Sequence, residues 1–241
     1  MRNHASDKRI RFYYTSLQFL YWMMFCSIYG FATLFLIYFK VDPAKIGGIL
    51  ALVNIASTIL QPFISQIIIK KSKVPLIVVL KTMTIGVVAV LLAGVIFPAF
   101  SILTYVLGGI LLVSMQSFLN ALAFEYTNSG NKINFGFSRA GGSLGFAGTS
   151  FLLGQLLEEF SAALLPMIAI GQAVLFLIIL LLLPVPSPVR SSEPVHISQR
   201  TWSSYHDPES WNAGLWSNRT SQQAVRKPLP SYHRRYRPYL R

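Results

Sequence analysis

Long windows of apolar sequence dominate the chain up to residue 184 and constrain its fold most strongly. Most charged residues fall in short segments that separate windows of roughly 20 residues or more. As an α-helix, such a window matches the hydrocarbon thickness of a bilayer, and a helix satisfies its own backbone hydrogen bonds there. Hydrophobic residues make up 53% of the 241 residues and charged residues only 12%. We therefore expect an all-α, polytopic membrane protein.

Six transmembrane helices are predicted, and helix-breaking residues mark the joints between them. Pro43, the lysine-rich stretch 70–73, Pro98 and the polar turn 127–132 each interrupt an apolar window. The predicted helices cover about residues 12–39, 46–69, 74–97, 101–124, 134–157 and 164–183. Together with the short N-terminal segment they form a predicted transmembrane domain, residues 1–184.

The charges at the joints predict the orientation in the membrane. Basic residues dominate the N-terminal segment and the joints after the second and fourth helices. They are Arg2, Lys8, Arg9, Arg11, Lys70, Lys71, Lys73 and Lys132. The opposite joints carry Lys40 and Lys45 beside Asp42, and Glu158 with Glu159. By the positive-inside rule, we expect a multi-pass protein of the cell membrane with both termini in the cytoplasm.

The composition changes abruptly after Pro184. Residues 185–241 contain nine basic and three acidic residues, a net charge of +6, and are rich in Ser, Pro, Trp and His. This composition predicts a disordered basic tail. Two interpretations stay open: a cytoplasmic extension, or the out-of-frame end of a longer gene. Arginines and tyrosines interleave near residue 235 but form no recognisable nucleic-acid-binding module. The glycosylation motif at Asn218 would lie in the cytoplasm.

The inventory of reactive side chains argues against an enzyme. Cys26 is the single cysteine, the four histidines lie outside the predicted helices, and no Gly-Lys-Ser/Thr phosphate-binding loop occurs. We therefore expect no catalytic residues, no metal site and no cofactor.

Function is expected at the few polar groups within the helices. Arg139 lies near the start of the fifth helix, where burying a guanidinium is costly without a partner. Glu125, at the end of the fourth helix, should lie at a similar depth, so a charge pair is geometrically reasonable. Asn120 and Gln116 lie successively deeper in the fourth helix, and with Glu125 they could line one polar stripe that points into the bundle. The alternatives are that Asn120 and Gln116 only join helices by hydrogen bonds, that Arg139 extends to the membrane interface, and that Glu125 is an ordinary loop carboxylate.

The glycines that follow Arg139 predict close helix packing. Gly141 and Gly145 stand four residues apart with Gly142 between them, a spacing that lets two helices approach. Phe146 is either a stacking platform for a substrate ring or an ordinary packing residue.

These features resemble the amino-terminal half of a major facilitator superfamily transporter. The resemblance rests on the six helices, on Gly47, on the Gln61-Pro62 end of the second helix, and on the pattern FGxxRxxGxxGFA from Phe135 to Ala147. It is greatest to the oligosaccharide:proton symporter (lactose permease-like) branch. The resemblance implies that Arg139, Glu125 and Phe146 contact a sugar or another small polar solute, with the proton gradient as driving force.

The resemblance covers about residues 12–184, one half of a transporter with two six-helix halves. A truncated or frame-disrupted product is therefore expected, unless the chain works as a homodimer or with a separate second half. The alternative is a non-transporting scaffold in the lipid bilayer whose basic tail recruits a partner.

Overall fold

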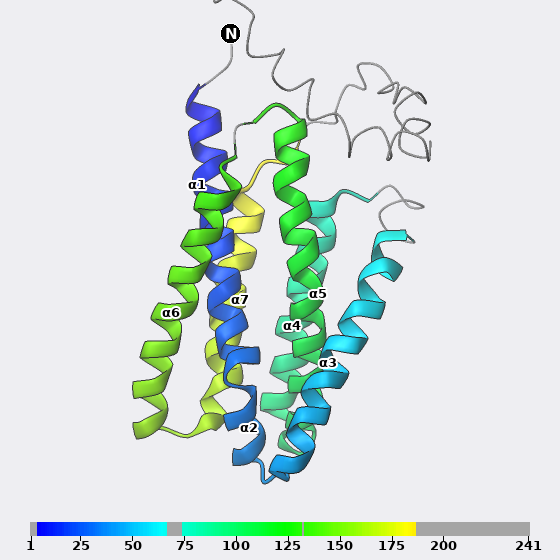
Figure 1. Cartoon of the computed structure of the whole chain (residues 1–241), viewed down its shortest axis with the longest axis vertical. Coiled ribbons are helices and arrows are strands. Elements are labelled where there is room, and N and C mark those ends of the chain that lie inside the picture. Colours follow the sequence, from blue (N-terminus) through cyan, green and yellow to red (C-terminus); the bar gives the residue numbers. More distant parts are fainter. Residues whose placement is uncertain (1–3, 67–73, 132, 187–241) are drawn as a thin grey trace, which may run out of the picture. The chain divides into compact units, whose positions relative to one another are not determined.

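The computed structural model describes residues 4–66, 74–131 and 133–186, and the regular structure in these ranges is helical without strands (Figure 1). The all-α prediction is confirmed for this part of the chain. The predicted disordered tail lies outside the described residues apart from Val185 and Pro186, as do the lysines of the 70–73 stretch and Lys132.

The helices overlap the predicted windows, but α1 begins eight residues before residue 12 and α5 continues four residues past residue 124. The first window coincides with most of α1 (His4–Phe25), with the π-helical turn η1 (Cys26–Gly30) and with α2 (Ala32–Tyr38). The later helices are α3 (Pro43–Phe63), α4 (Leu76–Ile96), α5 (Ser101–Asn128), α6 (Phe135–Glu159) and α7 (Leu165–Leu182). Short 3-10 turns, η3 (Pro98–Phe100) and η4 (Ala162–Leu164), precede α5 and α7.

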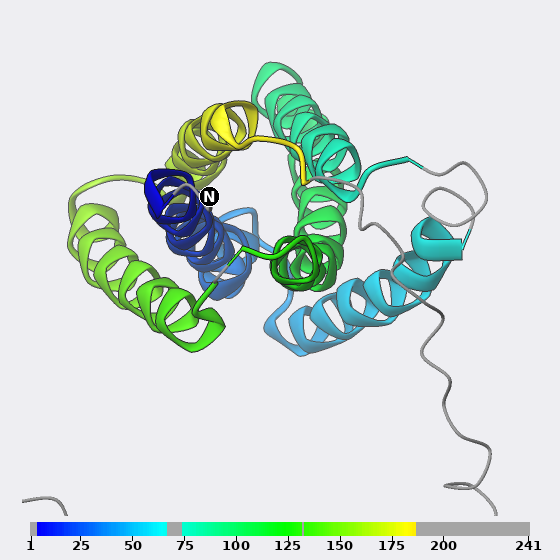
Figure 2. The same ribbon diagram turned by 90° about the horizontal axis from the view of Figure 1, so that it is seen from above.

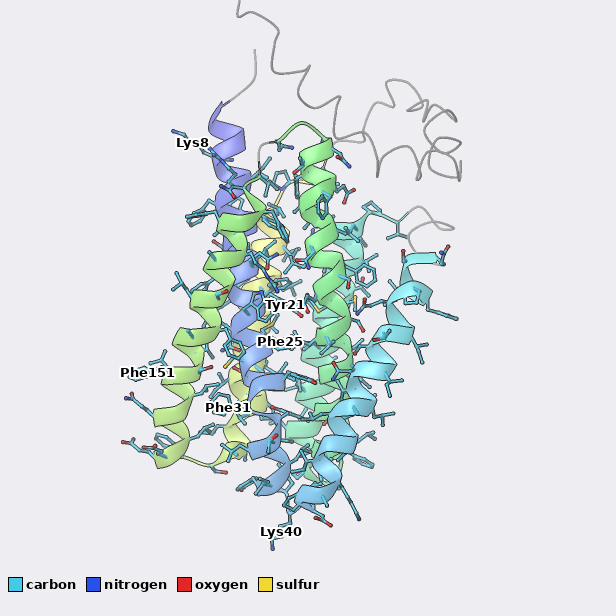
Figure 3. All side chains as sticks on the ribbon, viewed as in Figure 1. Lys8, Tyr21, Phe25, Phe31, Lys40 and Phe151 are labelled. Carbon is cyan, nitrogen blue, oxygen red and sulfur yellow. The ribbon has the colours of Figure 1, made fainter. Side chains whose placement is uncertain are left out.

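The long helices alternate in direction (Figure 1). The starts of α1, α4 and α6 lie at the same end as the C-terminal ends of α3, α5 and α7, and we name this the α1 end. The opposite end, where α2 finishes and α3 begins, is the α2 end. Lys8 lies at the α1 end and Lys40 at the α2 end (Figure 3). Among the described charges used to predict the orientation, Lys8 and Lys40 thus lie at opposite ends of the helices.

Five helical segments of the described chain are long and apolar enough to cross a membrane. They are Lys8–Tyr38, Pro43–Gln66, Leu76–Ile96, Pro98–Asn128 and Ala162–Leu182. The helix α6 has 25 residues but is not among them. Its sequence carries Arg139, two glutamates at its C-terminal end and many glycines and serines, which lower its hydropathy. The sixth span predicted at 134–157 is a helix, and its crossing of the membrane stays a prediction.

The first predicted helix contains a π-helical turn, a detail that the prediction for 12–39 did not include. At η1 the amide of Phe31 donates to the Cys26 carbonyl, a wider turn than in an α-helix, and Phe31 leaves the helical conformation. Contacts from distant helices hold this turn. The Tyr105 hydroxyl donates to the Ser27 carbonyl (2.9 Å), and the Ser27 hydroxyl donates to Gln172 Oε1 (2.9 Å).

The packing of the helices leaves α3 and α6 in outer positions (Figure 2). Helix α4 packs on α5 and α7, α1 packs on α6 and α7, and α3 packs on α5. Only 17% of the most apolar window of α3 is buried, against 44% for the segment that contains α1. The hydroxyls of the buried Tyr14 and Tyr21 donate to backbone carbonyls of α5, which ties α1 to the centre of the bundle.

Candidate functional site

Helix α6 begins so that Arg139 lies in its second turn. Asn134 caps the helix, because its side-chain oxygen accepts a hydrogen bond from the Phe137 amide (3.0 Å). The cap fixes the start of the helix and therefore the face on which Arg139 lies.

The glycines of α6 lie against α1. A side chain added at Gly142 would overlap the ring of Trp22, and one at Gly145 would lie 2.5 Å from the carbonyl oxygen of Phe19. At Gly141, an added carbon would lie 3.2 Å from the Thr15 methyl group. Small residues thus allow the two helices to approach closely, and this approach brings Trp22 to Arg139.

Arg139 is half-buried and stacks on Trp22. The guanidinium carbon lies 4.3 Å from the centre of the indole ring, a cation–π contact. Both Arg139 Nη1 and Trp22 Nε1 are buried, and neither has a hydrogen-bond partner among the described residues. Buried donors in native proteins are usually paired. The pair therefore has two hydrogen-bond donors for which the described residues supply no acceptor.

Phe146 extends the aromatic part of this site. Its ring meets Trp22 edge to face at 6.3 Å between centroids, and the centroid of the Phe25 ring lies 5.1 Å from that of Trp22. The structure thus brings Arg139 and Phe146 together through a residue of α1. Figure 3 shows Phe25 and Tyr21 on this stretch of α1.

A buried glutamine connects the predicted polar residues of α5 to α1. Gln18 Nε2 donates to the Tyr14 hydroxyl (2.8 Å) and to Asn120 Oδ1 (3.3 Å). Gln18 Oε1 is buried and has no hydrogen-bond partner within the described ranges. Asn120 thus accepts a hydrogen bond that joins α5 to α1, while Gln18 Oε1 remains an acceptor without a partner in this part of the chain. Gln116 is half-buried and lies one turn before Asn120 in α5.

Glu125 lies at a different site. Helix α5 continues to Asn128, so Glu125 belongs to its last turns and faces a pocket of about 1080 Å³. The pocket is lined by the end of α3, the start of α4 and the C-terminal part of α5. Gln61 and Ser117 are among the lining residues, and the Ser117 hydroxyl donates to Gln61 Oε1 (2.7 Å). Glu125 Oε2 is buried without a partner in the described part of the chain.

No ion pair joins Glu125 to Arg139 among the described residues, so the expected charge pair is not formed. The physical reason is the packing of the helices. Arg139 faces α1, on which α6 packs, whereas Glu125 faces the pocket between α3, α4 and α5. Similar depth at the end of neighbouring helices is not enough to bring two side chains together.

Sequence reasoning missed Trp22 and Gln18. Both lie within the first apolar window, four residues apart on one face of α1, and this face meets α6 and α5 only in the fold. An amide one helical turn from a tryptophan, inside an otherwise apolar helix, was the available signal.

No metal-binding group of three or more His, Cys, Asp or Glu side chains occurs in residues 4–66, 74–131 and 133–186. Cys26 is buried, and its sulfur lies 3.1 Å from the Ser150 hydroxyl of α6.

Antiparallel apolar helices with an arginine and unpaired polar atoms between them define a multi-pass membrane protein, and transporters are built in this way. Residues 13–213 match the MFS_1 like family. The chain belongs to this family and thus to the major facilitator superfamily, which indicates a membrane transporter rather than an enzyme. The match includes residues on both sides of Pro184. No curated protein matches the chain significantly, and neither does any solved structure.

Proposed function

We propose that the chain forms one six-helix unit of a secondary active transporter for sugars or other small polar solutes. The observation that carries this proposal is the stack of Arg139 on Trp22, in which Nη1 and Nε1 are both buried and without partners. A solute with hydroxyl groups would accept from these two donors, and Gln18 Oε1 would accept from it. Trp22 and Phe146 would cover its apolar faces.

The proposed driving force is the proton gradient, with Glu125 as the proton carrier. It is a half-buried carboxylate inside the candidate span Pro98–Asn128, and it lines the pocket of about 1080 Å³ described above. A carboxylate in this position can bind and release a proton between the two sides of the membrane. Because Glu125 is separate from Arg139, the proposal places proton binding and solute binding at different sites of the unit.

Transport is proposed to need a second unit. In transporters of this architecture the solute lies between two helical halves, and one half rocks against the other. The outer positions of α3 and α6, which pack mainly on α5 and on α1 respectively, leave the other sides of both helices available to such a partner. A second copy of this chain, or a separate six-helix chain, would complete the cavity.

Equilibrium binding to the purified chain tests the proposal. Tritiated lactose, sucrose and uridine would serve as probes of hydroxylated solutes. We expect at least one of them to bind, and Arg139→Ala to weaken its binding by at least about tenfold, the loss expected for one buried charged hydrogen bond. Ser143→Ala is the matched control, because Ser143 lies on the exposed face of α6 one turn away. Equal binding by wild type and Arg139→Ala would exclude this site.

A further inference from the structure

Two adjoining hollows lie on α1 near the α1 end of the helices. The first, of about 320 Å³, is lined by Lys8, Arg11 and Asn134 together with Ser138 and two phenylalanines. The second, of about 480 Å³, runs along α1 where α6 and α7 flank it. Phe12 and Thr15 line both hollows, so the two lie next to each other.

The second hollow is an apolar groove. Its floor is one face of α1, formed by residues spaced three or four apart between Phe12 and Leu20, a length of roughly 12 Å along the helix. Gly141 of α6 forms one wall and leaves it open, since it has no side chain. Leu175 and Ile178 of α7 form the other wall, and both are exposed. A flexible hydrocarbon chain fits a groove of this kind.

The first hollow is basic and rich in hydroxyl groups. Lys8 and Arg11 lie on exposed positions one turn apart on α1. The hydroxyls of Thr15 and Ser138 are hydrogen-bonded to each other (2.9 Å) across α1 and α6, which holds the floor of the hollow in place. No acidic side chain lines either hollow among the described residues. The chemistry of this hollow suits a phosphate group.

We propose that the two hollows together bind one anionic phospholipid, with its phosphate against Lys8 and Arg11 and one acyl chain in the groove beside α7. The cations lie where the candidate span Lys8–Tyr38 begins, at the level expected for lipid headgroups. Basic pockets between helices at this level attract anionic lipids. A soluble phosphate would use only the first hollow, whereas a phospholipid uses both. This inference does not depend on solute transport.

Lipid retention by the purified full chain tests the site. The chain would be placed in nanodiscs of equal parts phosphatidylglycerol and phosphatidylcholine, and the lipids retained after mild detergent extraction would be measured by native mass spectrometry. We expect phosphatidylglycerol to be enriched about tenfold, and Lys8→Gln with Arg11→Gln to abolish the enrichment. The matched control is Lys40→Gln with Lys45→Gln, since both lysines lie towards the α2 end and are exposed.

A second pair of variants tests the groove separately. Ile178→Trp places a bulky ring in the groove and should reduce retention of phosphatidylglycerol about tenfold, while Leu181→Trp, on an exposed position of α7 that does not line the groove, should not. Soluble glycerol 3-phosphate should not displace the lipid.

Three outcomes would overturn the proposal. They are equal retention of the two lipids by the wild type, equal losses in the test and control variants, and displacement by glycerol 3-phosphate. The last would show that the first hollow binds a free phosphate and that the groove takes no part.

Discussion

Arg139 stacks on Trp22 while its Nη1 keeps no hydrogen-bond partner among the described residues. A guanidinium is planar and presents its donors in a fixed fork, so its contact with the ring also fixes the direction of those donors. The geometry, and not only the charge, should therefore determine what the site binds.

Arg139→Lys tests this view of the residue. An ammonium group keeps the charge but loses the planar stack and the fork of donors, so we expect solute binding to weaken by about tenfold or more. The free energy of unfolding should change by no more than about 1 kcal/mol, since an exposed cation–π contact contributes about 0.5–1 kcal/mol and a buried one about 2. Equilibrium binding and thermal unfolding measure the two effects, with Arg9→Lys on an exposed position as the control. Full binding by the lysine variant would contradict a role for the fork.

For Arg139, the sequence predicted the importance of the residue but not its neighbour in the fold. The cost of burying a guanidinium singled out Arg139, and its glycine-rich surroundings predicted a close neighbour. The identity of this neighbour depends on the helix that packs against α6. A carboxylate close in sequence, Glu125, was the natural candidate, but α6 packs on α1, and the neighbour is Trp22.

The contact of α1 with α6 depends on glycines, and a matched pair of variants tests it. In Gly145→Ala the new methyl group would lie 2.5 Å from a backbone oxygen of α1, so one helix must move. We expect a loss of about 1–3 kcal/mol in the free energy of unfolding, as is usual for overpacking. Gly148→Ala meets nothing within 4 Å and should leave stability unchanged or slightly raised. Thermal unfolding in one detergent compares the two, and equal melting temperatures would contradict this packing.

The turn η1 depends on the hydrogen bond between Ser27 and Gln172, which a double-mutant cycle can measure. Ser27→Ala leaves the buried Gln172 Oε1 without a donor, and we expect a loss of about 1–3 kcal/mol. Adding Gln172→Leu removes the unpaired acceptor, so the double variant should be more stable than the sum of the single losses predicts. Strictly additive losses, measured by thermal unfolding, would show that the bond does not stabilise the turn.

Helix length and position followed from the sequence because apolar length and breaking residues are local signals. The π-helical turn η1 (Cys26–Gly30) could not be predicted from the sequence, because the first window stays apolar through it. Its partners, Tyr105 and Gln172, come from helices far along the chain. Because contacts from distant helices stabilise this wider turn, the sequence around it carries no pattern that would predict it.

For the whole molecule, the predicted topology places Lys8 in the cytoplasm and Lys40 outside, and the fold places them at opposite ends (Figure 3). Cysteine labelling in intact cells tests this prediction, after Cys26→Ser removes the native thiol while keeping a hydroxyl near Ser150. A membrane-impermeant maleimide should label Lys40→Cys and not Lys8→Cys. Labelling of Glu159→Cys but not Asn134→Cys would show that α6 also crosses the membrane. The reverse pattern of labelling would contradict the predicted orientation, and equal labelling of both α6 variants would contradict the sixth span.

Uptake into proteoliposomes tests the central claim most directly. The purified chain would be reconstituted at a density that allows two copies per vesicle or more, and uptake of the tritiated solute that binds best would be followed under an imposed inward proton gradient. We predict uptake that a protonophore stops and that falls to the level of protein-free vesicles in Arg139→Ala, while Ser143→Ala transports normally. Uptake by Arg139→Ala at the wild-type rate, or wild-type uptake no faster than in protein-free vesicles for every solute that binds, would contradict the account.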